Sequence, residues 1–514
     1  MTNRDFEYRQ ASTEWSNRIL LLSLLGIAYL TLFPFRFDFS VTTIFHRYPF
    51  LLATSVKRPY FLDFFLNILL FVPFGFGLSA RARKKGKGRW TSFLMALILG
   101  ALTSYMVEVA QFYIPERDSG WEDVFSNTMG SLVGFLLFEL CGGALLVAAS
   151  KCESLFDTWL SPRWTAMLLI VYFAMWFAVS IPLQNQTRLS NWDPRCYLFV
   201  GNDASSQHLW KGQISRLQIW NRALPEQAIQ ALKNGTSGND ISSGLLGSYD
   251  FTDSPPFRDQ ENLLPPLQRI TAPPQLHNRD ISDSDSPSWL SSRIPVENLT
   301  REIMKSGQFT VHMVVRPPEA FEDSDGYIVS LSQSESNVNF HVREEGDFLV
   351  LWIRNPLSER RSKLAWYVPG AFEEGKQRDI VASYDGSDAF LFLDGVPVPE
   401  TYRLSPGASL RHRFFFIQAA DLEGYIIVYE TLIFLPAGLL IGMAAWKCFA
   451  QRIPGLWILV LGWVLPAALL EILLAGISGR RIWIGNFVLS LAFGVVGMLL
   501  INADQRGKAV VRAS

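Results

Sequence analysis

The sequence is poor in the side chains that most often form catalytic or metal centres. It has four cysteines, none of them in a Cys-x-x-Cys pair, and six scattered histidines without an HExxH motif. A zinc or thiol redox site is therefore not expected, and no cofactor is predicted. Basic and acidic residues nearly cancel, which leaves a net charge of −1. Because this balance provides no polybasic surface, nucleic acid is not expected as a partner.

Long apolar runs are abundant. Apolar residues make up 49% of the chain and charged residues 18%, a mixture that indicates membrane spans together with a water-soluble part. A helix of roughly 20 apolar residues crosses a bilayer. The first run lacks a small-residue cleavage site, so we expect an anchor and not a cleaved signal peptide. Eight spans are predicted, near residues 16–35, 62–80, 92–113, 124–149, 164–183, 425–447, 455–476 and 482–502.

The short loops predict the orientation of these helices. Residues 81–89 form the most basic short loop of the chain, and the positive-inside rule places such loops in the cytoplasm. Alternation then puts both termini in the cytoplasm and the stretch 184–424 on the opposite side. Arg480 and Arg481 fall outside in this scheme and are its one discordant point.

Two parts of the chain follow the same plan. The motif Asn-Ile-Leu-Leu-Phe-Val-Pro-Phe-Gly at residues 67–75 corresponds to Glu-Thr-Leu-Ile-Phe-Leu-Pro-Ala-Gly at residues 430–438. Each motif precedes an apolar helix with one acid, then arginine, then an apolar helix that opens with asparagine. We therefore predict two parallel four-helix repeats. In the second copy we expect a shorter connecting loop and no acid matching Asp123.

Three helices of the first repeat carry an acid and an amide at helical spacing, which places each pair on one face. Two interpretations stay open. Hydrogen bonds between helices can hold a bundle together, at under about 1 kcal/mol each. Alternatively, these groups form an outward-facing pocket for a polar headgroup, an ion or a proton. Because packing does not require charge, we favour the pocket. Its candidate binding residues are Asp63, Asn67, Glu108, Gln111, Arg117, Asp123 and Asn127.

The second repeat retains only part of this polar set. Ile426 stands in the place of Asp63, whereas an acid and arginine remain. One full site and one vestigial or altered site is the simplest interpretation, and a pseudo-symmetric pathway between the repeats is the alternative. The candidate residues of the second repeat are Glu430, Glu471, Arg480, Arg481 and Asn486.

These residues resemble the VanZ-like membrane family, whose name comes from a protein of glycopeptide-resistance clusters that lowers susceptibility to teicoplanin. The family pattern is matched over about residues 15–150, and more weakly over 425–502. The resemblance implies an integral envelope protein of the bacterial plasma membrane, without supplying a mechanism. The matching positions are Asn67 to Gly75, Glu108 with Gln111, Arg117, and Asp123, Asn127, Gly130 and Gly134.

Residues 184–424 have a different character, because short apolar–polar alternating runs are separated by Gly, Asp and Ser turns. This pattern is typical of a β-sandwich. The Pro-, Ser- and Asp-rich stretch 253–292 is expected to be a long loop. The predicted strands are 309–316, 327–331, 348–353, 379–383 and 389–393.

This segment resembles the laminin-G and concanavalin-A-like jelly-roll family. The elements that carry the resemblance are 309–317, 384–386 with 392–395, and 210–224. In that family the last of these elements closes the domain, whereas here it opens it, so we expect a circular permutation. The resemblance implies carbohydrate binding, and calcium stays an open alternative. No strand carries paired glutamates at glycosidase spacing, so hydrolysis is not expected.

Together, these features predict a polytopic α-helical membrane protein with about eight transmembrane helices and an inserted all-β jelly-roll sandwich. We expect the first VanZ-like repeat plus helix five in residues 1–183, the extracytoplasmic sandwich in 184–424, and a degenerate second VanZ-like segment in 425–514.

The leading hypothesis is a non-enzymatic envelope protein that binds a lipid or glycan headgroup in the polar pocket, with a role in glycopeptide resistance or in exopolysaccharide or envelope biology. The expected partners are membrane lipid and a glycan or lipid-linked saccharide, and the sequence does not define the oligomeric state. One alternative is an intramembrane enzyme acting on a lipid-linked sugar, with Glu108 or Asp123 as general base. Transport by duplicated repeats is the other alternative.

Overall fold

A computed structural model of the full chain resolves into two compact units, residues 1–164 and 165–514. The structure describes residues 3–32, 37, 39, 61–114, 120–159, 161–234, 239–252, 255–271, 288–319, 325–358, 364–399, 402–413, 417, 419–450 and 460–513.

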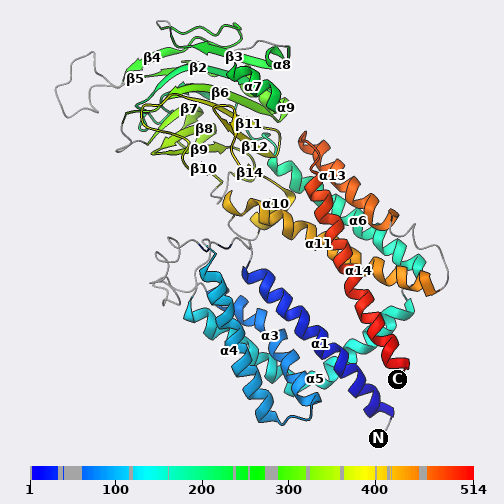
Figure 1. Ribbon diagram of the computed structural model, residues 1–514. Coiled ribbons are helices and arrows are strands. Elements are labelled where there is room, and N and C mark those ends of the chain that lie inside the picture. The colour runs from blue at the N-terminus through cyan, green and yellow to red at the C-terminus, as the bar shows by residue number, and fades with distance from the viewer. Residues whose placement is uncertain are drawn as a thin grey trace. The chain divides into compact units, whose positions relative to one another are not determined.

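Among the described residues, four long helices form the first unit (Figure 1). Three of these helices share an apolar core, in which Ile27, Phe71, Phe74, Leu78 and Val107 are buried against one another. Helix α3 continues through the basic residues up to residue 84, so the predicted loop 81–89 narrows to residues 85–88. The helices are α1 (Asn3–Leu32), α3 (Phe61–Lys84), α4 (Arg89–Phe112) and α5 (Trp121–Trp159).

Glycines set the close approach of α3 to α5. A Cβ atom at Gly75 would lie 1.9 Å from the carbonyl oxygen of Ser131, and one at Gly134 would lie 2.1 Å from that of Val72. Any larger residue would therefore push the two backbones apart. Small residues at helix contacts are typical of membrane bundles, where close packing replaces the hydrophobic effect as the source of stability. The glycines of the motif thus have a packing role.

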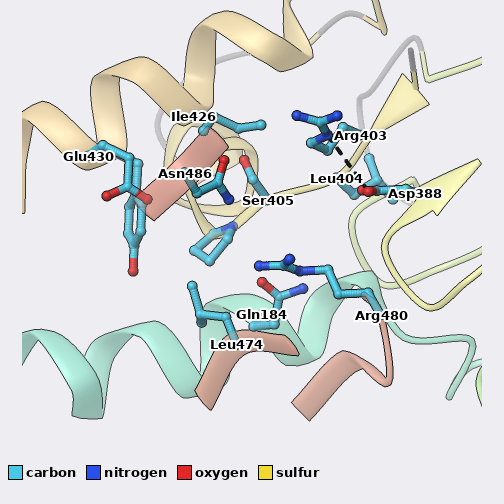
Figure 2. A pocket seen from close by; sticks show the side chains of 12 residues that line it. Gln184, Asp388, Arg403, Leu404, Ser405, Ile426, Glu430, Leu474, Arg480 and Asn486 are labelled. Atoms are coloured by element: carbon cyan, nitrogen blue, oxygen red, sulfur yellow. Dashed lines mark ion pairs between the residues drawn. The ribbon is translucent and has the colours of Figure 1, made fainter. Parts of the chain in front are cut away.

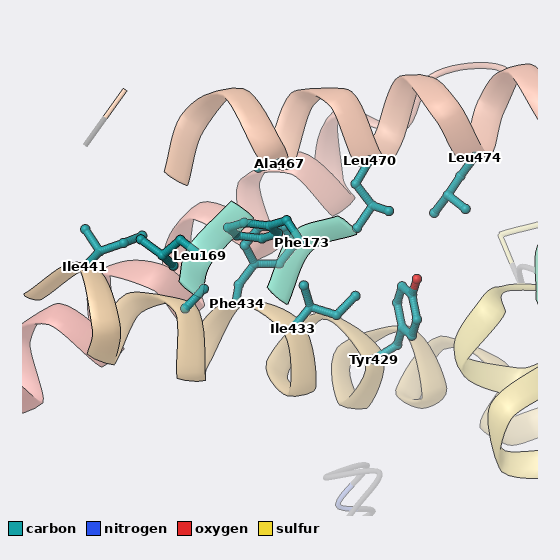
Figure 3. Packing of buried hydrophobic residues seen from close by; sticks show 10 residues of the cluster. Leu169, Phe173, Tyr429, Ile433, Phe434, Ile441, Ala467, Leu470 and Leu474 are labelled. Atoms are coloured by element: carbon teal, nitrogen blue, oxygen red, sulfur yellow. The ribbon is translucent and has the colours of Figure 1, made fainter. Parts of the chain in front are cut away.

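The helices of the second unit pack around an apolar cluster (Figure 3). Leu169 and Phe173 of one helix meet Ile433 and Phe434 of the next, and Leu470 joins them from a third. The short π-helix η6 (Val460–Val464) leads into that third helix. The helices are α6 (Pro162–Gln184), α11 (Leu422–Ala450), α13 (Leu465–Ser478) and α14 (Ile484–Ala513).

The prediction of eight membrane helices is confirmed. Among the described residues, eight helices are long and apolar enough to cross a bilayer. Their apolar parts are residues 15–32, 64–84, 89–112, 121–151, 163–187, 422–445, 460–478 and 484–501.

The segment between α6 and α11 forms two antiparallel sheets, as predicted (Figure 1). The strand order is β10-β9-β8-β7-β1-β5-β4 in the first sheet and β13-β12-β11-β6-β2-β3 in the second, where β14 also pairs with β12. The first sheet contains β1 (Tyr197–Val200), β4 (Gln268–Thr271), β5 (Ser288–Ser291), β7 (Asp325–Ser334), β8 (Asn337–Glu345), β9 (Phe348–Ile353) and β10 (Trp366–Val368). The second contains β2 (Gln213–Trp220), β3 (Leu245–Asp250), β6 (Phe309–Arg316), β11 (Arg378–Tyr384), β12 (Asp388–Leu393), β13 (Val396–Pro397) and β14 (Tyr402–Arg403).

All five predicted strands are present, as β6, β7, β9, β11 and β12. The prediction that 253–292 is a loop throughout is wrong, because β4 and β5 pair with each other inside it. These strands are short and partly polar, so their alternation gives little signal. Strand β2 lies between β6 and β3 in the second sheet. The element 210–224, which contains β2, is therefore an integral part of the sandwich. The circular permutation stays a prediction.

Short helices complete the sandwich. Helix α7 (Glu226–Lys233) covers a cluster in which Ala228 and Ile229 pack with Trp220, Val381 and Phe392. Helix α10 (Pro406–His412) begins at the N-cap Ser405, whose Oγ accepts a hydrogen bond from the backbone N–H of Ala408 at 3.2 Å. Helix α10 packs against α11, so it connects the sandwich with the helices of the second unit.

Candidate functional site

Polar side chains of α3, α4 and α5 meet in the first unit. Asn67 Nδ2 donates a hydrogen bond to Asp123 Oδ1 at 2.7 Å, and Asn127 Nδ2 donates one to Ser104 Oγ at 2.9 Å. Glu108 Oε2 accepts a hydrogen bond from the backbone N–H of Gly120 at 2.9 Å. We call Asn67, Ser104, Glu108, Asp123 and Asn127 the first polar cluster. The structure thus brings together four of the residues that the sequence selected.

Buried acceptor atoms without donors mark this region. Glu108 is only 1% exposed, and the nearby carboxylate of Asp123 repels its charge. Gln111 Nε2 donates a hydrogen bond to the carbonyl of Thr31 on α1 at 2.9 Å. Its Oε1 atom and the Oδ1 atom of Asn127 are buried and have no partner in the described part of the chain. Such orphaned acceptors are uncommon in native proteins and call for an explanation.

Two predicted site residues cannot be placed in this cluster. Asp63 belongs to the first turn of α3, but its side chain lies outside what the structure describes. Arg117 also lies outside the described residues. Their roles stay predictions.

A second set of buried polar groups lies in the second unit. Arg480 donates hydrogen bonds to both carboxylate oxygens of Glu471, at 2.6 and 2.9 Å. Glu471 also accepts from the backbone N–H of Trp483 at 2.6 Å. A bidentate pair of this kind is held by geometry as well as by charge. We call Glu430, Glu471, Arg480, Asn486 and Ser490 the second polar cluster.

The remaining members of the second polar cluster are also paired. Ser490 Oγ donates a hydrogen bond to Glu430 Oε2 at 2.8 Å, and Asn486 Nδ2 donates one to Glu471 Oε2 at 3.3 Å. No buried side-chain atom of this cluster lacks a partner among the described residues. Arg481, also selected from the sequence, is exposed and contributes only its carbonyl oxygen, which accepts from Arg480 at 2.9 Å.

Backbone contacts reveal how the two clusters correspond. Gly75 faces the Ser131 carbonyl, and Gly438 faces the Gly494 carbonyl. Gly438 follows Gly75, and Gly494 follows Ser131, by the same number of residues.

The same displacement relates the acid contacts, since Glu108 meets the N–H of Gly120 and Glu471 meets that of Trp483. Asn486 therefore stands in the place of Asp123, and Arg480 in the place of Arg117. The expected shorter loop in the second segment is confirmed by the helix bounds, since residues 479–483 separate α13 from α14 and residues 113–120 separate α4 from α5. The spacing from acid to arginine is nevertheless equal in both segments.

A narrow pocket separates the second polar cluster from the sandwich (Figure 2). It has room for about one water molecule, so it is too small for a lipid headgroup. Two buried acceptor atoms of its lining, Gln184 Oε1 and Asp388 Oδ2, accept no hydrogen bond within the described part of the chain. The lining residues are Gln184, Asp388, Arg403, Leu404, Ser405, Pro406, Ile426, Tyr429, Glu430, Leu474, Arg480 and Asn486.

The pKa values of two side chains on the sandwich side of this pocket are shifted. Burial, and next the neighbouring charge of Asp385, raise the pKa of Asp388 to about 7. Burial also lowers the pKa of Arg403. The two side chains form an ion pair with an Nε to Oδ2 distance of 3.7 Å. Sequence reasoning missed these residues, because nothing in their local pattern distinguishes them from ordinary turn and edge-strand residues.

A row of rings crosses the first sheet. Tyr327 of β7 and His341 of β8 have ring centroids 4.8 Å apart, and His341 and Trp352 of β9 stack at 5.7 Å. We call these three residues the aromatic row. Burial, and next the charge of Arg343, lower the pKa of His341 to about 3, so the imidazole is neutral near pH 7. The signal in the sequence would have been a ring on the same face of three successive strands.

The described residues contain no group of three or more His, Cys, Asp or Glu side chains that could hold a metal ion. Calcium binding in the sandwich therefore gains no support from this part of the chain.

The fold and the clusters define a polytopic helical membrane protein with an inserted antiparallel β-sandwich. Residues 20–142 match the VanZ/LLP1 family model. The chain is also 25% identical over 125 residues to Protein VanZ of Enterococcus faecium, an alignment that covers 24% of this chain and 74% of that protein. The predicted VanZ-like resemblance is thus confirmed for the first helical region. No solved structure matches the chain at a significant level.

Proposed function

We propose that this protein binds the headgroup of an envelope lipid or lipid-linked saccharide through the first polar cluster, without catalysing a reaction. The observation that carries the proposal is the orphaned acceptor Asn127 Oδ1 of the cluster, together with Gln111 Oε1, which lies one turn beyond Glu108 on α4. Leaving a buried acceptor unpaired costs about 1–3 kcal/mol. A bound group that donates hydrogen bonds to both atoms would offset this cost.

The chemistry of the cluster favours a ligand rich in donors. Carboxylates accept hydrogen bonds, and here Glu108 and Asp123 repel one another. An amino group would relieve that repulsion, and hydroxyl groups would satisfy the amide oxygens. The sequence expectation that Arg117 meets a phosphate or carboxylate belongs to the same proposal. A zwitterionic or aminated headgroup combines these features.

The proposed location is the bacterial plasma membrane, with both termini in the cytoplasm and the sandwich on the outer side. The basic residues at the end of α3 and the start of α4 support this orientation through the positive-inside rule. The equal displacement between the contacts of the two clusters supports the proposal that the two four-helix segments are repeats.

Native mass spectrometry of the detergent-purified protein tests the proposal. The double variant Glu108→Gln/Asp123→Asn keeps the volume of both side chains and removes their charge. As a control, Glu139→Gln changes a carboxylate of α5 that pairs with Arg83 and Arg89. We expect a co-purified aminated lipid or lipid-linked saccharide on the wild type and the control, and none on the double variant. Equal lipid on all three, with intact melting curves, would contradict the proposal.

The aromatic row supports a second candidate function, which is glycan binding by the sandwich. We propose that a sugar ring stacks on Trp352 beside His341, since aromatic faces favour C–H-rich surfaces. Binding of the full-length protein to a glycan array tests this. Trp352→Ala should abolish the signal, whereas Phe348→Ala, another aromatic residue of β9, should leave it unchanged. Equal signals from both variants would contradict the proposal.

A further inference from the structure

The second polar cluster lies directly beside the β-sandwich of its own chain. The guanidinium carbon of Arg403 on β14 lies 3.0 Å from the centroid of the Trp483 ring, which belongs to the connection between α13 and α14. Cation–ring contacts of this kind stabilise more strongly when water is excluded from them. The same connection carries Arg480, the cation of the cluster.

The sandwich and the helices of the second unit also meet through other close contacts. Gln308 Nε2 donates a hydrogen bond to the carbonyl of Gly479 at 2.7 Å. A Cβ atom at Gly386 would lie 1.9 Å from the carbonyl oxygen of Ser478. Thr187, just after α6, donates a hydrogen bond from its Oγ1 to the carbonyl of Gly386 at 2.8 Å. The turn at Gly386 is therefore held against the helices from two directions.

The charges on the two sides are complementary. Arg480 neutralises Glu471 within the cluster and also attracts the buried carboxylate of Asp388 on the sandwich. Arg403 attracts the same carboxylate from within the sandwich. Figure 2 shows Arg480 below Asp388, with Arg403 beside Asp388. Complementary charges of this kind fix the register of an interface more than its strength.

We propose that the second polar cluster is a docking site for the chain's own sandwich and is not a second ligand site. Glu471 is already paired with Arg480, and the adjacent pocket has room for about one water molecule. In the first polar cluster, Asn127, which corresponds to Ser490, carries an orphaned acceptor. The duplicated plan has thus diverged, with one copy serving attachment of the inserted domain. This proposal does not depend on any ligand of the first polar cluster.

Hydrogen exchange of the full-length protein in nanodiscs tests the docking. Gly386→Ala forces a Cβ atom onto the Ser478 carbonyl. Gly370→Ala is the matched control, because Gly370 also has a positive φ of 66° on the sandwich but has nothing within 4 Å. We expect exchange in residues 479–487, which are the connection and the first turn of α14, to become roughly tenfold faster in Gly386→Ala, with β6 and β11 unchanged. Equal exchange there in both variants would overturn the proposal.

A second variant keeps the test decisive if Gly386→Ala loosens the whole sandwich. Arg403→Gln removes the cation above the Trp483 ring without altering a turn. We expect this variant to speed exchange in 479–487 by at least roughly threefold. Exchange at the wild-type rate in Arg403→Gln would overturn the docking proposal. Neither exchange result depends on whether the first polar cluster retains or loses lipid.

Discussion

Replacing Arg480 with methionine should be among the most destabilising single changes in the second unit. The side chains of Arg480 and Glu471 are each 5% exposed, and their ion pair has an N to O distance of 2.6 Å. Removing one member of a buried pair costs about 3–5 kcal/mol, because the remaining charge is left uncompensated. Glu471 would keep its hydrogen bonds from Trp483 and Asn486. We therefore expect the lower end of that range, about 3 kcal/mol.

A double-mutant cycle separates the pair from its surroundings. Glu471→Leu/Arg480→Met replaces both charges with apolar groups and should lie within about 1 kcal/mol of the wild type. The coupling should then be at least about 2 kcal/mol, measured by equilibrium unfolding in detergent with increasing SDS. Arg481→Met, which changes the exposed neighbour, should alter stability by less than about 0.5 kcal/mol. A cost below about 1 kcal/mol for Arg480→Met would refute this reasoning.

Three further predictions concern other parts of the chain. Gly75→Ala should destabilise the first unit by about 1–3 kcal/mol, because its Cβ atom meets backbone. Gly26→Ala, with nothing within 4 Å, should be neutral or stabilising in the same SDS titration. Burial and the charge of Asp385 raise the pKa of Asp388 to about 7, well above its value of about 4 when unfolded. Stability should therefore fall as the pH rises from about 4 to 7, and Asp388→Asn should reduce this fall in melting temperatures measured between pH 5 and 8. Trp210→Phe loses a 2.6 Å hydrogen bond to the buried carboxylate of β8 and should lower sandwich stability by about 1–3 kcal/mol, measured by thermal unfolding.

The helices and most strands could be predicted because each follows from local composition. A run of apolar residues long enough to span a bilayer leaves few alternatives to a helix. In β6 and β12, apolar residues either alternate with polar ones or follow one another between clear turns. The stretch around β4 lacked such a signal. It is a four-residue strand with no buried residue, so its pairing with β5 depends on a partner distant in sequence.

The first polar cluster could be anticipated from spacing alone. Asn67, Glu108, Asp123 and Asn127 each lie on a helix whose period fixes the face that they occupy. What spacing could not supply is the pairing between helices, such as the hydrogen bond from Asn67 to Asp123. Spacing also could not predict that Gln111 Oε1 lacks a hydrogen-bond donor, because this depends on the tertiary neighbours of the side chain.

The correspondence of the second cluster required backbone contacts. Sequence comparison paired the two helix-opening asparagines, Asn127 and Asn486, because they are the same residue type. The contacts of Gly438 and of the Trp483 N–H support instead the pairing of Asn486 with Asp123 under the proposed repeat. The contact with the sandwich could not be predicted either, because Arg403 and Trp483 are distant in sequence and neither lies in a recognisable motif.

The most direct test of the account is a cryo-electron microscopy map of the protein in nanodiscs of bacterial lipid. We propose that the first polar cluster binds a headgroup, whereas the second binds the chain's own sandwich. We predict density for a polar headgroup within hydrogen-bonding distance of Gln111 and Asn127, and Arg403 seated on Trp483 beside an undisturbed Glu471–Arg480 pair. A headgroup bound between Glu471 and Arg480, or clear side chains with no density at the first cluster, would contradict it.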